Sequence, residues 1–480
     1  MLGILKKGIP ASFILPGILA LSLVLRFIVI NQSLWLDEAI GALVVKSQSY
    51  LQILKEFPLH DNHPPLYYLA LKFWTDIFEY SEVALRSLSV AFGVGTVFLV
   101  YRIGKLISPR LGILASLLLA TSPFAIYYSQ EARMYAMAAF LAAAAFYFFL
   151  QKKWIFFSIS ITALVFTDYM PVFLLPVFWI IGFLGKKDKG WWKSFALSHV
   201  PLLVLGLAWA PIFLAQSAAG RWLVQNLPDW QKIAGGATFK QVVLVWMKFT
   251  LGRISLANKT LYYFLAAVSS IPFIVILFKA WQERKRILGF WFWLLAPLLL
   301  GFLVSFFFPA FIYFRFLYVV PAFYLLLGWG VVNFKNSRIQ YSLLAALLAV
   351  NFIGWGIYVS QPRQQREQWR QAVTFVEEKA KSNEAALFNF TEPFAPYQWY
   401  SKNTVKAVGG TDFLLANEEK TREMTRKALS DIKGVYYFEY LWELHDPGRI
   451  VEKEIKEEGF IKVSAFDFPG VGIIGYWKRL

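Results

Sequence analysis

Met134-Tyr-Ala-Met-Ala-Ala-Phe-Leu-Ala-Ala-Ala-Ala-Phe-Tyr-Phe-Phe-Leu150 is an uninterrupted apolar run, closely followed by Lys152 and Lys153. A helix of about 20 apolar residues crosses the hydrocarbon core of a bilayer, and basic residues at one end favour the cytoplasmic side. Similar runs recur as far as residue 359, and the chain is 58% hydrophobic and 18% aromatic. A soluble domain of that composition could not cover its surface with polar groups. The sequence therefore predicts an α-helical polytopic membrane protein.

The apolar runs predict about 11 transmembrane helices. They lie near residues 9–30, 84–106, 111–128, 134–150, 154–168, 171–184, 195–215, 261–280, 288–308, 311–332 and 340–359. Alternate connections are basic, whereas the short connections 129–133, 168–171 and 309–315 contain only Arg133 and Arg315 as basic residues. The positive-inside rule then places the N-terminus, with Lys6 and Lys7, in the cytoplasm. We expect a multi-pass protein of the cytoplasmic (plasma) membrane.

One further apolar segment, which begins at His63-Pro-Pro, is ambiguous. Counting it as a span would invert every later connection and put the basic clusters outside. The segment is also short, and it contains Lys72 with Asp76 close behind. We therefore predict an amphipathic helix at the outer interface. Two outer loops result, at residues 31–83 and 216–260, and the second mixes aromatic and basic residues such as Trp230 and Arg253.

The composition changes after about residue 360. Charged helical stretches then alternate with β-rich runs such as Ala385–Phe390, Val435–Tyr440 and Phe460–Phe466. This pattern predicts a soluble α/β domain of about 120 residues, within the usual range of domain sizes. The predicted organisation is a transmembrane domain at 1–359 and a second domain at 360–480. With an odd number of spans, the second domain is extracytoplasmic.

Charge and cysteine content exclude several classes of function. The net charge is +18, but most lysines and arginines lie in short loops between apolar runs, where topology and membrane lipids account for them better than nucleic acid does. We therefore expect no nucleic-acid partner. The chain has no cysteine. Disulfides, thiolate nucleophiles and cysteine-ligated metals are excluded.

An acidic pair, Asp37 and Glu38, follows the first predicted span on the outer side. Adjacent carboxylates at an anionic membrane surface do not help to hold a helix in place. They could serve as a general base and its orienting partner. The alternative is a pair of acids at a helix start, where they complement the N-terminal dipole.

A second polar cluster, Ser129-Gln-Glu-Ala-Arg-Met-Tyr135, lies between two spans on the same side. Glu131 and Arg133 are two residues apart, so we expect them to point to different partners. Arg133 suits a phosphate or carboxylate, and Glu131 a hydroxyl or a cation. The alternative is an ordinary polar turn between helices.

Single charges within or beside the spans are also candidates, because charges at this depth often mark functional sites. Arg315 is a candidate for gripping an anionic lipid headgroup, and Asp168 belongs to the same class. Arg26 and Arg86 have a second interpretation, in which they extend to the outer headgroups.

The sequence His60-Asp-Asn-His63-Pro-Pro65 has a spacing that permits metal binding. Only two imidazoles and one carboxylate are available locally. The prolines more plausibly set the entry to the interfacial helix. We assign no metal ligand and leave a divalent cation open as a cofactor.

The motifs in this order resemble the superfamily C (GT-C) membrane glycosyltransferases, in particular the protein O-mannosyltransferase and aminoarabinose transferase group (family 39-like). The matching features are Leu34-Trp-Leu-Asp-Glu-Ala39, His63-Pro-Pro-Leu-Tyr67, Ala84-Leu-Arg-Ser87, Ser122-Pro123, Gln130-Glu-Ala-Arg-Met-Tyr135, Arg315-Phe-Leu317, Pro321 and Trp369. They cover the predicted membrane part of the chain. The lumenal repeat modules of eukaryotic O-mannosyltransferases are absent from the sequence.

The resemblance implies transfer of a sugar from a polyprenyl-phosphate carrier to a hydroxyl acceptor at the outer face. Asp37 would take the acceptor proton with inversion at the anomeric carbon, and Glu38 would orient the acceptor or a cation. Arg133 and Arg315 would hold the departing lipid phosphate. The other substrate-binding residues implied are Glu131, Tyr135 and His63.

The sequence is compatible with three functions. The leading hypothesis is a glycosyltransferase acting on a glycan, lipid or protein acceptor. The alternative is a transporter or flippase of lipid-linked sugars, although such proteins often show repeats and broken midplane helices. The third is a scaffold whose outer domain recruits a partner.

Overall fold

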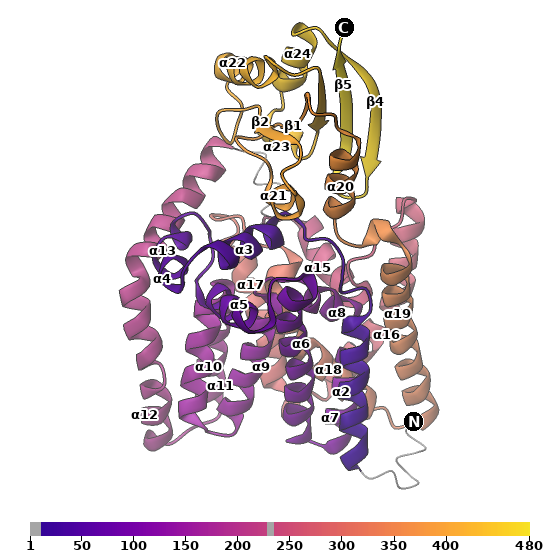
Figure 1. Cartoon of the computed structure of the whole chain (residues 1–480). Coiled ribbons are helices and arrows are strands. Elements are labelled where there is room, and N and C mark those ends of the chain that lie inside the picture. Colours follow the sequence, from indigo (N-terminus) through magenta and orange to yellow (C-terminus); the bar gives the residue numbers. More distant parts are fainter. Residues whose placement is uncertain (1–10, 228–234) are drawn as a thin grey trace. The chain divides into compact units, whose positions relative to one another are not determined.

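The structure is a computed structural model that describes residues 11–227 and 235–480. Lys6, Lys7, Trp230 and the start of the first predicted span lie outside these residues. The described chain forms two compact units. The first comprises 11–30, 48–222 and 235–364, and the second comprises 31–47, 223–227 and 365–480. Figure 1 shows the elements in chain order.

The first unit consists of helices. Among the described residues, five are long and apolar enough to cross a membrane. They are α6 (Glu82–Lys105), α12 with α13 (Lys189–Leu197 and Val200–Asn226), α16 (Lys259–Gln282), η4 with α18 (Tyr313–Val319 and Val320–Val332) and α19 (Ser337–Ser360). Shorter apolar helices accompany them: α2 (Ala11–Phe27), α9 (Tyr135–Leu150), α10 (Trp154–Thr167), η2 with α11 (Met170–Leu174 and Leu175–Leu184) and α17 (Leu288–Val304). The chain is therefore a multi-pass membrane protein.

The predicted span at 111–128 is broken. Helix α7 (Pro109–Ala120) ends at Thr121, and α8 (Pro123–Ser129) begins after Ser122, with a bend of 62°. The Ser122 hydroxyl caps α8 by accepting the Ala125 N–H, and Pro123 lacks the N–H that would continue α7. Gly112 of α7 also packs closely against α6, because an added Cβ would come within 2.7 Å of the Tyr101 carbonyl oxygen. The segment predicted as one span at 111–128 is thus two apolar helices with a sharp bend between them.

Short helices precede α6, as the ambiguous segment led us to expect. They are α4 (Tyr50–Lys55), η1 (Phe57–Leu59) and α5 (Leu66–Phe78). Helix α5 follows Pro64-Pro65, buries Tyr68 and Leu71, and exposes Phe73 and Ile77. The helix predicted for this segment is thus present, and its position at the outer interface stays a prediction. The predicted outer loop at 216–260 contains more helix than expected, because α13 continues to Asn226 and α15 covers Phe239–Leu251.

The second unit contains a five-stranded sheet of order β2-β1-β3-β5-β4. The strands are β1 (Glu384–Phe388), β2 (Lys406–Gly409), β3 (Gly434–Phe438), β4 (Phe460–Phe468) and β5 (Gly472–Arg479). Strands β2, β1 and β3 are parallel, whereas β5 pairs antiparallel with both β3 and β4. The three β-rich runs of the sequence correspond to β1, β3 and β4. The α/β prediction for this part of the chain is confirmed.

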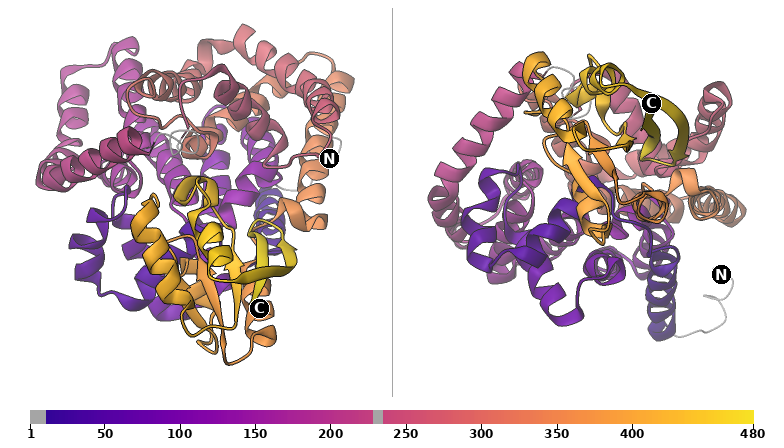
Figure 2. Two further views of the ribbon diagram at one scale, coloured as in Figure 1. Left: turned by 90° about the horizontal axis from the view of Figure 1, so that it is seen from above. Right: turned by 45° about the horizontal axis from the view of Figure 1, so that its top comes forward.

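Two hydrophobic cores cover the two faces of this sheet. On one face, α20 (Trp369–Lys379) and α21 (Ala395–Tyr400) pack against Phe388 and Phe438. On the other face, α22 (Glu418–Leu429) and α24 (Ile450–Glu457) pack against Leu387 and Tyr437. The short helix α23 (Trp442–His445) follows β3. The alternation of apolar residues along β1 and β3 supplies both faces. Figure 2 shows the sheet and its helices from two further directions.

The second unit also includes helix α3 (Leu36–Ser47), far away in sequence from the sheet. Leu36 packs against the core that Trp369 and Phe438 form, and the Lys46 ammonium lies 5.1 Å from the centre of the Trp399 ring. The sequence assigned residues 31–83 as one outer loop of the transmembrane domain. The structure instead divides this loop between the two units after Ser47.

Candidate functional site

Residues 130–134 form the turn between α8 and α9, and hydrogen bonds hold this turn in place. The Gln130 amide nitrogen donates to the carbonyl oxygens of Arg26 (2.8 Å) and Ile28 (2.6 Å). The Tyr358 hydroxyl donates to the Gln130 amide oxygen at 2.8 Å. Glu131 is 1% exposed and Arg133 is 5% exposed. The predicted polar segment therefore buries both charged side chains on an anchored turn.

Arg133 belongs to a group of polar side chains from four segments. Its guanidinium donates to the Tyr68 hydroxyl at 3.1 Å, and His63 Nδ1 lies 3.1 Å from an Asp61 carboxylate oxygen. Burial acts to raise the pKa of Asp61. The positive charges of His63 and Arg133, together with hydrogen bonds from His63 and Tyr68, outweigh burial and lower that pKa to about 2. Asp61 is therefore a carboxylate at neutral pH.

Asp168 joins the same group at the end of α10. Its backbone is extended, and its carboxylate accepts the Met170 N–H at 3.1 Å. Burial raises the pKa of Asp168, and the charges of His63, Arg315 and Arg133 partly oppose that rise. Both arginines are therefore within electrostatic reach of one carboxylate. We call Asp61, His63, Tyr68, Arg133, Asp168 and Arg315 the Arg133 cluster.

Arg315 lies in η4, where Phe316 departs from helical geometry, and its side chain is half-buried. Within residues 11–227 and 235–480, this side chain makes no hydrogen bond and no ion pair shorter than 4 Å. A guanidinium with five donors in this position is available to an anionic ligand.

Gln216 of α13 was missed by sequence reasoning. Its amide nitrogen donates to three carbonyl oxygens, those of Pro58 (2.8 Å), Asp61 (2.9 Å) and His63 (3.2 Å). Its amide oxygen accepts the Tyr169 hydroxyl at 2.5 Å. In the sequence, Gln216 is only a neutral polar residue directly after the predicted span at 195–215. Gln216 fixes the backbone that carries Asp61 and His63.

Glu131 faces a second group, which we call the Lys248 cluster: Tyr127, Glu131, Lys248, Arg253 and Tyr313. The Arg253 guanidinium donates to the Tyr127 hydroxyl and lies 4.9 Å from the centre of that ring. The charge of Glu131 acts on Arg253. The Lys248 ammonium lies 5.9 Å from the centre of the Tyr313 ring. The charge of Glu131 thus acts within the Lys248 cluster, whereas Arg133 bonds Tyr68 in the Arg133 cluster.

Lys248 is a buried cation near other cations. It is 8% exposed, and its ammonium donates to the Ile254 carbonyl at 3.2 Å. Burial, and then the charges of Arg253 and Lys259, lower the pKa of Lys248 to about 8. The aromatic-basic character of residues 216–260 pointed to this region. It did not single out Lys248.

Tyr135, which the family resemblance suggested for substrate binding, begins α9 with 4% exposure. Its ring centre lies 5.5 Å from that of Tyr128 and 5.2 Å from that of Phe314. The structure thus places Tyr135 in an aromatic wall between the turn at 130–134 and η4. Its binding role stays a prediction.

The acidic pair lies in the second unit, in the first turn of α3. Glu38 is fully buried, and its carboxylate accepts the Trp35 N–H at 3.5 Å, so the helix-start interpretation describes part of its role. Asp37 is half-buried, and its charge contributes to the raised pKa of Tyr440, after burial and Glu367. The two acids are thus in different surroundings.

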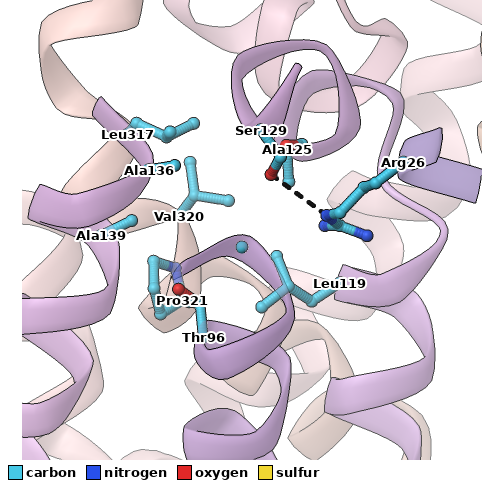
Figure 3. Close-up of a pocket in the computed structure, with 11 residues that line it drawn as sticks. Arg26, Thr96, Leu119, Ala125, Ser129, Ala136, Ala139, Leu317, Val320 and Pro321 are labelled. Carbon is cyan, nitrogen blue, oxygen red and sulfur yellow. Dashed lines mark hydrogen bonds between the residues drawn. The ribbon is translucent and has the colours of Figure 1, made fainter. Parts of the chain in front are cut away.

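Arg26 and Arg86 are each 1% exposed, so they do not extend to headgroups. Arg26 donates to the hydroxyls of Ser129 (3.1 Å) and Ser22 (2.7 Å) and to the Ala120 carbonyl (3.1 Å). Figure 3 shows Arg26 and Ser129 beside a cavity of about 20 Å³, which has room for about one water molecule. Arg86 donates to the Ile30 carbonyl at 2.7 Å. Both arginines satisfy backbone carbonyls where helices end or break.

In the described part of the chain, no group of three or more histidine, aspartate or glutamate side chains is arranged to hold a metal ion. His63, the metal-ligand alternative of the sequence, instead contacts Asp61.

Comparisons with known proteins match both the sequence and the fold. Residues 62–214 match the sequence model of the family described as dolichyl-phosphate-mannose-protein mannosyltransferase. A search of the curated proteins finds no match. Among solved structures, ArnT from Cupriavidus metallidurans bound to undecaprenyl phosphate is 11% identical with a TM-score of 0.59, over 96% of this chain and 97% of that one.

A second solved structure is the archaeal oligosaccharyltransferase AglB from Archaeoglobus fulgidus, in complex with an inhibitory peptide and a dolichol-phosphate. It is 13% identical with a TM-score of 0.52, over 97% of this chain and 74% of that one. These likenesses extend over nearly the whole chain at very low identity, so they concern the fold. The resemblance that the motifs predicted is confirmed: the chain has the fold of the superfamily C membrane glycosyltransferases, and residues 62–214 match the model of their dolichyl-phosphate-mannose-protein mannosyltransferase family.

Proposed function

We propose that the protein is an integral membrane glycosyltransferase. It transfers a sugar from a polyprenyl-phosphate carrier to a hydroxyl acceptor on the outer face of the cytoplasmic membrane. The N-terminus is then cytoplasmic, and the C-terminal domain is extracytoplasmic. The acceptor is a cell-surface glycan, a glycolipid or a protein. The fold shared with ArnT and AglB, whose structures contain undecaprenyl phosphate and dolichol-phosphate, supports a lipid-phosphate donor.

The observation that carries the proposal is Arg315, a half-buried guanidinium with no hydrogen-bonding partner in the described chain. Arg133 acts on the same carboxylate, Asp168, so the two arginines converge on one region of the first unit. A lipid phosphate between them would gain charge-assisted hydrogen bonds from planar donors. These bonds strengthen as the phosphate takes up negative charge on leaving the sugar.

The Lys248 cluster offers a second set of cations for the same class of donor. Lys248 has a lowered pKa because it is buried near Arg253 and Lys259. An anion placed among these side chains would relieve their mutual repulsion. The Tyr313 ring lies beside Lys248 and the Tyr127 ring beside Arg253, and such aromatic faces suit the rings of a sugar or the start of a lipid tail.

In the transfer step, Asp37 accepts the proton of the acceptor hydroxyl while that oxygen bonds to the anomeric carbon. The bond from the anomeric carbon to the phosphate oxygen breaks, and the electron pair leaves with the polyprenyl phosphate. Attack from the opposite side inverts the anomeric configuration. Glu38 supports the first turn of α3, and Glu131 and His63 bind sugar or acceptor hydroxyls.

The test is to reconstitute the protein in lipid nanodiscs with polyprenyl-phosphate sugars and candidate acceptors. The proposal predicts a glycosylated acceptor and one equivalent of free polyprenyl phosphate, both detected by mass spectrometry. Movement of intact carrier across proteoliposome membranes without any sugar transfer would instead favour a flippase. Lipids that co-purify with the protein would identify which donors to try first.

A further inference from the structure

Residues 31–34, which lead into the acidic pair, are hydrogen-bonded one after another to residues 366–400 of the same unit. The Asn31 side-chain oxygen accepts from the Arg370 guanidinium at 3.1 Å, and the Gln32 side-chain oxygen accepts the Arg366 N–H at 2.8 Å. The Ser33 hydroxyl donates to the Glu367 carbonyl oxygen. The Leu34 N–H donates to the Tyr400 hydroxyl at 2.7 Å. Four consecutive residues thus have fixed partners.

Packing extends this attachment into α3. Leu34 is fully buried, and Leu36 packs on the core that contains Trp369. At the other end of the helix, Lys46 lies over the ring of Trp399, next to Tyr400 in sequence. The segment is therefore held at both ends by α20 and α21 or by residues beside them.

Glu367 connects this attachment to the interior of the unit. Its carboxylate accepts from the Trp369 indole N–H at 2.7 Å and from the Tyr440 hydroxyl at 3.0 Å. Burial raises the pKa of Tyr440, and the charges of Glu367 and Asp37 raise it further, so Tyr440 stays a protonated donor at physiological pH. One glutamate thus bonds Ser33 through its backbone and Tyr440 through its side chain.

We propose that the C-terminal domain is the positioning device for Asp37. Tyr400, Glu367 and Tyr440 are positioning residues: they fix the start of α3 and thereby the direction of the Asp37 carboxylate. This inference rests on the proposed function, in which Asp37 takes the acceptor proton. A general base works only within hydrogen-bonding reach of its proton, and a shift of about 1 Å can cost about a hundredfold in rate. The outer domain then contributes to the chemistry without touching the substrate.

The decisive variant is Tyr400→Phe, which removes one hydroxyl and leaves the aromatic packing intact. The matched control is Tyr436→Phe, a buried tyrosine of the same core whose hydroxyl has no hydrogen bond to residues 31–38. Both variants are measured as full-length protein in nanodiscs. The readouts are kcat, the donor KM, and hydrogen exchange of the peptide covering 31–38.

For Tyr400→Phe we expect faster exchange within 31–38, a kcat about tenfold lower and an unchanged donor KM. Tyr440→Phe should give the same pattern through Glu367, and Tyr436→Phe should leave kcat and exchange as in the wild type. An unchanged kcat in Tyr400→Phe with faster exchange would overturn the positioning role. Unchanged exchange would overturn the attachment itself.

The two proposals fail in different ways. If the wild type transfers no sugar, the proposed function fails, and the positioning of a base fails with it. If the wild type is active and Asp37→Asn is inactive, while Tyr400→Phe and Tyr440→Phe keep full kcat, only the positioning inference fails.

Discussion

The guanidinium of Arg133 donates a hydrogen bond to the hydroxyl of Tyr68, 3.1 Å away, and so joins the turn before α9 to helix α5. This contact links two motifs that are far apart in the sequence. Arg133 belongs to Gln130–Tyr135, and Tyr68 directly follows His63–Tyr67. It also orients the arginine beside Asp61 and Asp168.

Replacing Arg133 with lysine should lower kcat/KM for the donor by at least about tenfold, because a lysine cannot reproduce the planar fork of donors. Tyr68→Phe should cost less, since it removes the hydroxyl that contacts Arg133 and Asp61 but leaves the Arg133 guanidinium itself in place. Steady-state kinetics of both variants check this order. Tyr50→Phe is the control, because Tyr50 is exposed and its hydroxyl donates to the exposed side chain of Asp76. A larger loss for Tyr68→Phe than for Arg133→Lys would contradict the assignment.

Arg315→Ala should weaken donor binding. A hydrogen bond to a charged group is worth about 1.5–3 kcal/mol, so we expect the donor KM to rise about ten- to hundredfold. Titration of a donor analogue into nanodiscs measures the same change as an affinity. Arg338→Ala, at an exposed position in the first turn of α19, is the control. If both variants bind the analogue as the wild type does, Arg315 does not contact the phosphate.

The lowered pKa of Lys248 predicts that kcat/KM depends on pH. Its pKa is lowered to about 8, so the side chain is mostly charged at pH 7 and neutral well above pH 8. If the ammonium attracts the donor phosphate, kcat/KM must fall as the pH rises through about 8. Lys248→Arg keeps the positive charge at high pH, so kcat/KM should fall less above pH 8 in this variant. Lys240→Gln, at an exposed position, should leave the pH dependence of kcat/KM unchanged. A falling limb that persists in Lys248→Arg would assign the titration to another group.

Gln216→Glu tests the support of the 58–63 backbone, because the two side chains have nearly the same shape. The glutamate has no N–H for the three carbonyl oxygens and places an acceptor against them. Buried groups left without partners cost about 1–3 kcal/mol, so the midpoint of thermal unfolding should fall. Hydrogen exchange of the peptide covering 56–65 should accelerate. Gln151→Glu, an exposed glutamine at the end of α9, should change neither quantity.

Much of the fold was predictable because it depends on local patterns. The apolar runs predicted the helices, and the β-rich runs predicted β1, β3 and β4. The break at Ser122-Pro123 was not predicted, although Pro123 is a residue that can end a helix. The apolar run continues through this position, and a hydropathy pattern does not show where a helix bends. The attachment of residues 31–47 to the second unit was also missed. It depends on Tyr400 and Glu367, more than three hundred residues later in the sequence.

Some residues of the candidate site could likewise be predicted from the sequence, and others could not. Motifs identified Arg133, Glu131 and Arg315, because a charge within or beside an apolar run is conspicuous. Lys248 and Gln216 were not conspicuous, since Lys248 is one of many basic residues and Gln216 a neutral amide. Their roles arise from tertiary contacts with Arg253 and with the 58–63 backbone. Burial of Arg26 against the Ala120 carbonyl was likewise not visible in sequence.

The central claim is that Asp37 accepts the proton in a sugar transfer from a polyprenyl-phosphate donor. The most direct measurement is the turnover of purified wild type, Asp37→Asn and Asp467→Asn with one polyprenyl-phosphate sugar and its acceptor. Asp467 is an exposed aspartate of β4 and serves as the control. Asp37→Asn should bind the donor normally but lose at least about a hundredfold in kcat, in the range of general-base catalysis, while Asp467→Asn should keep full activity. Undiminished transfer by Asp37→Asn would contradict this claim.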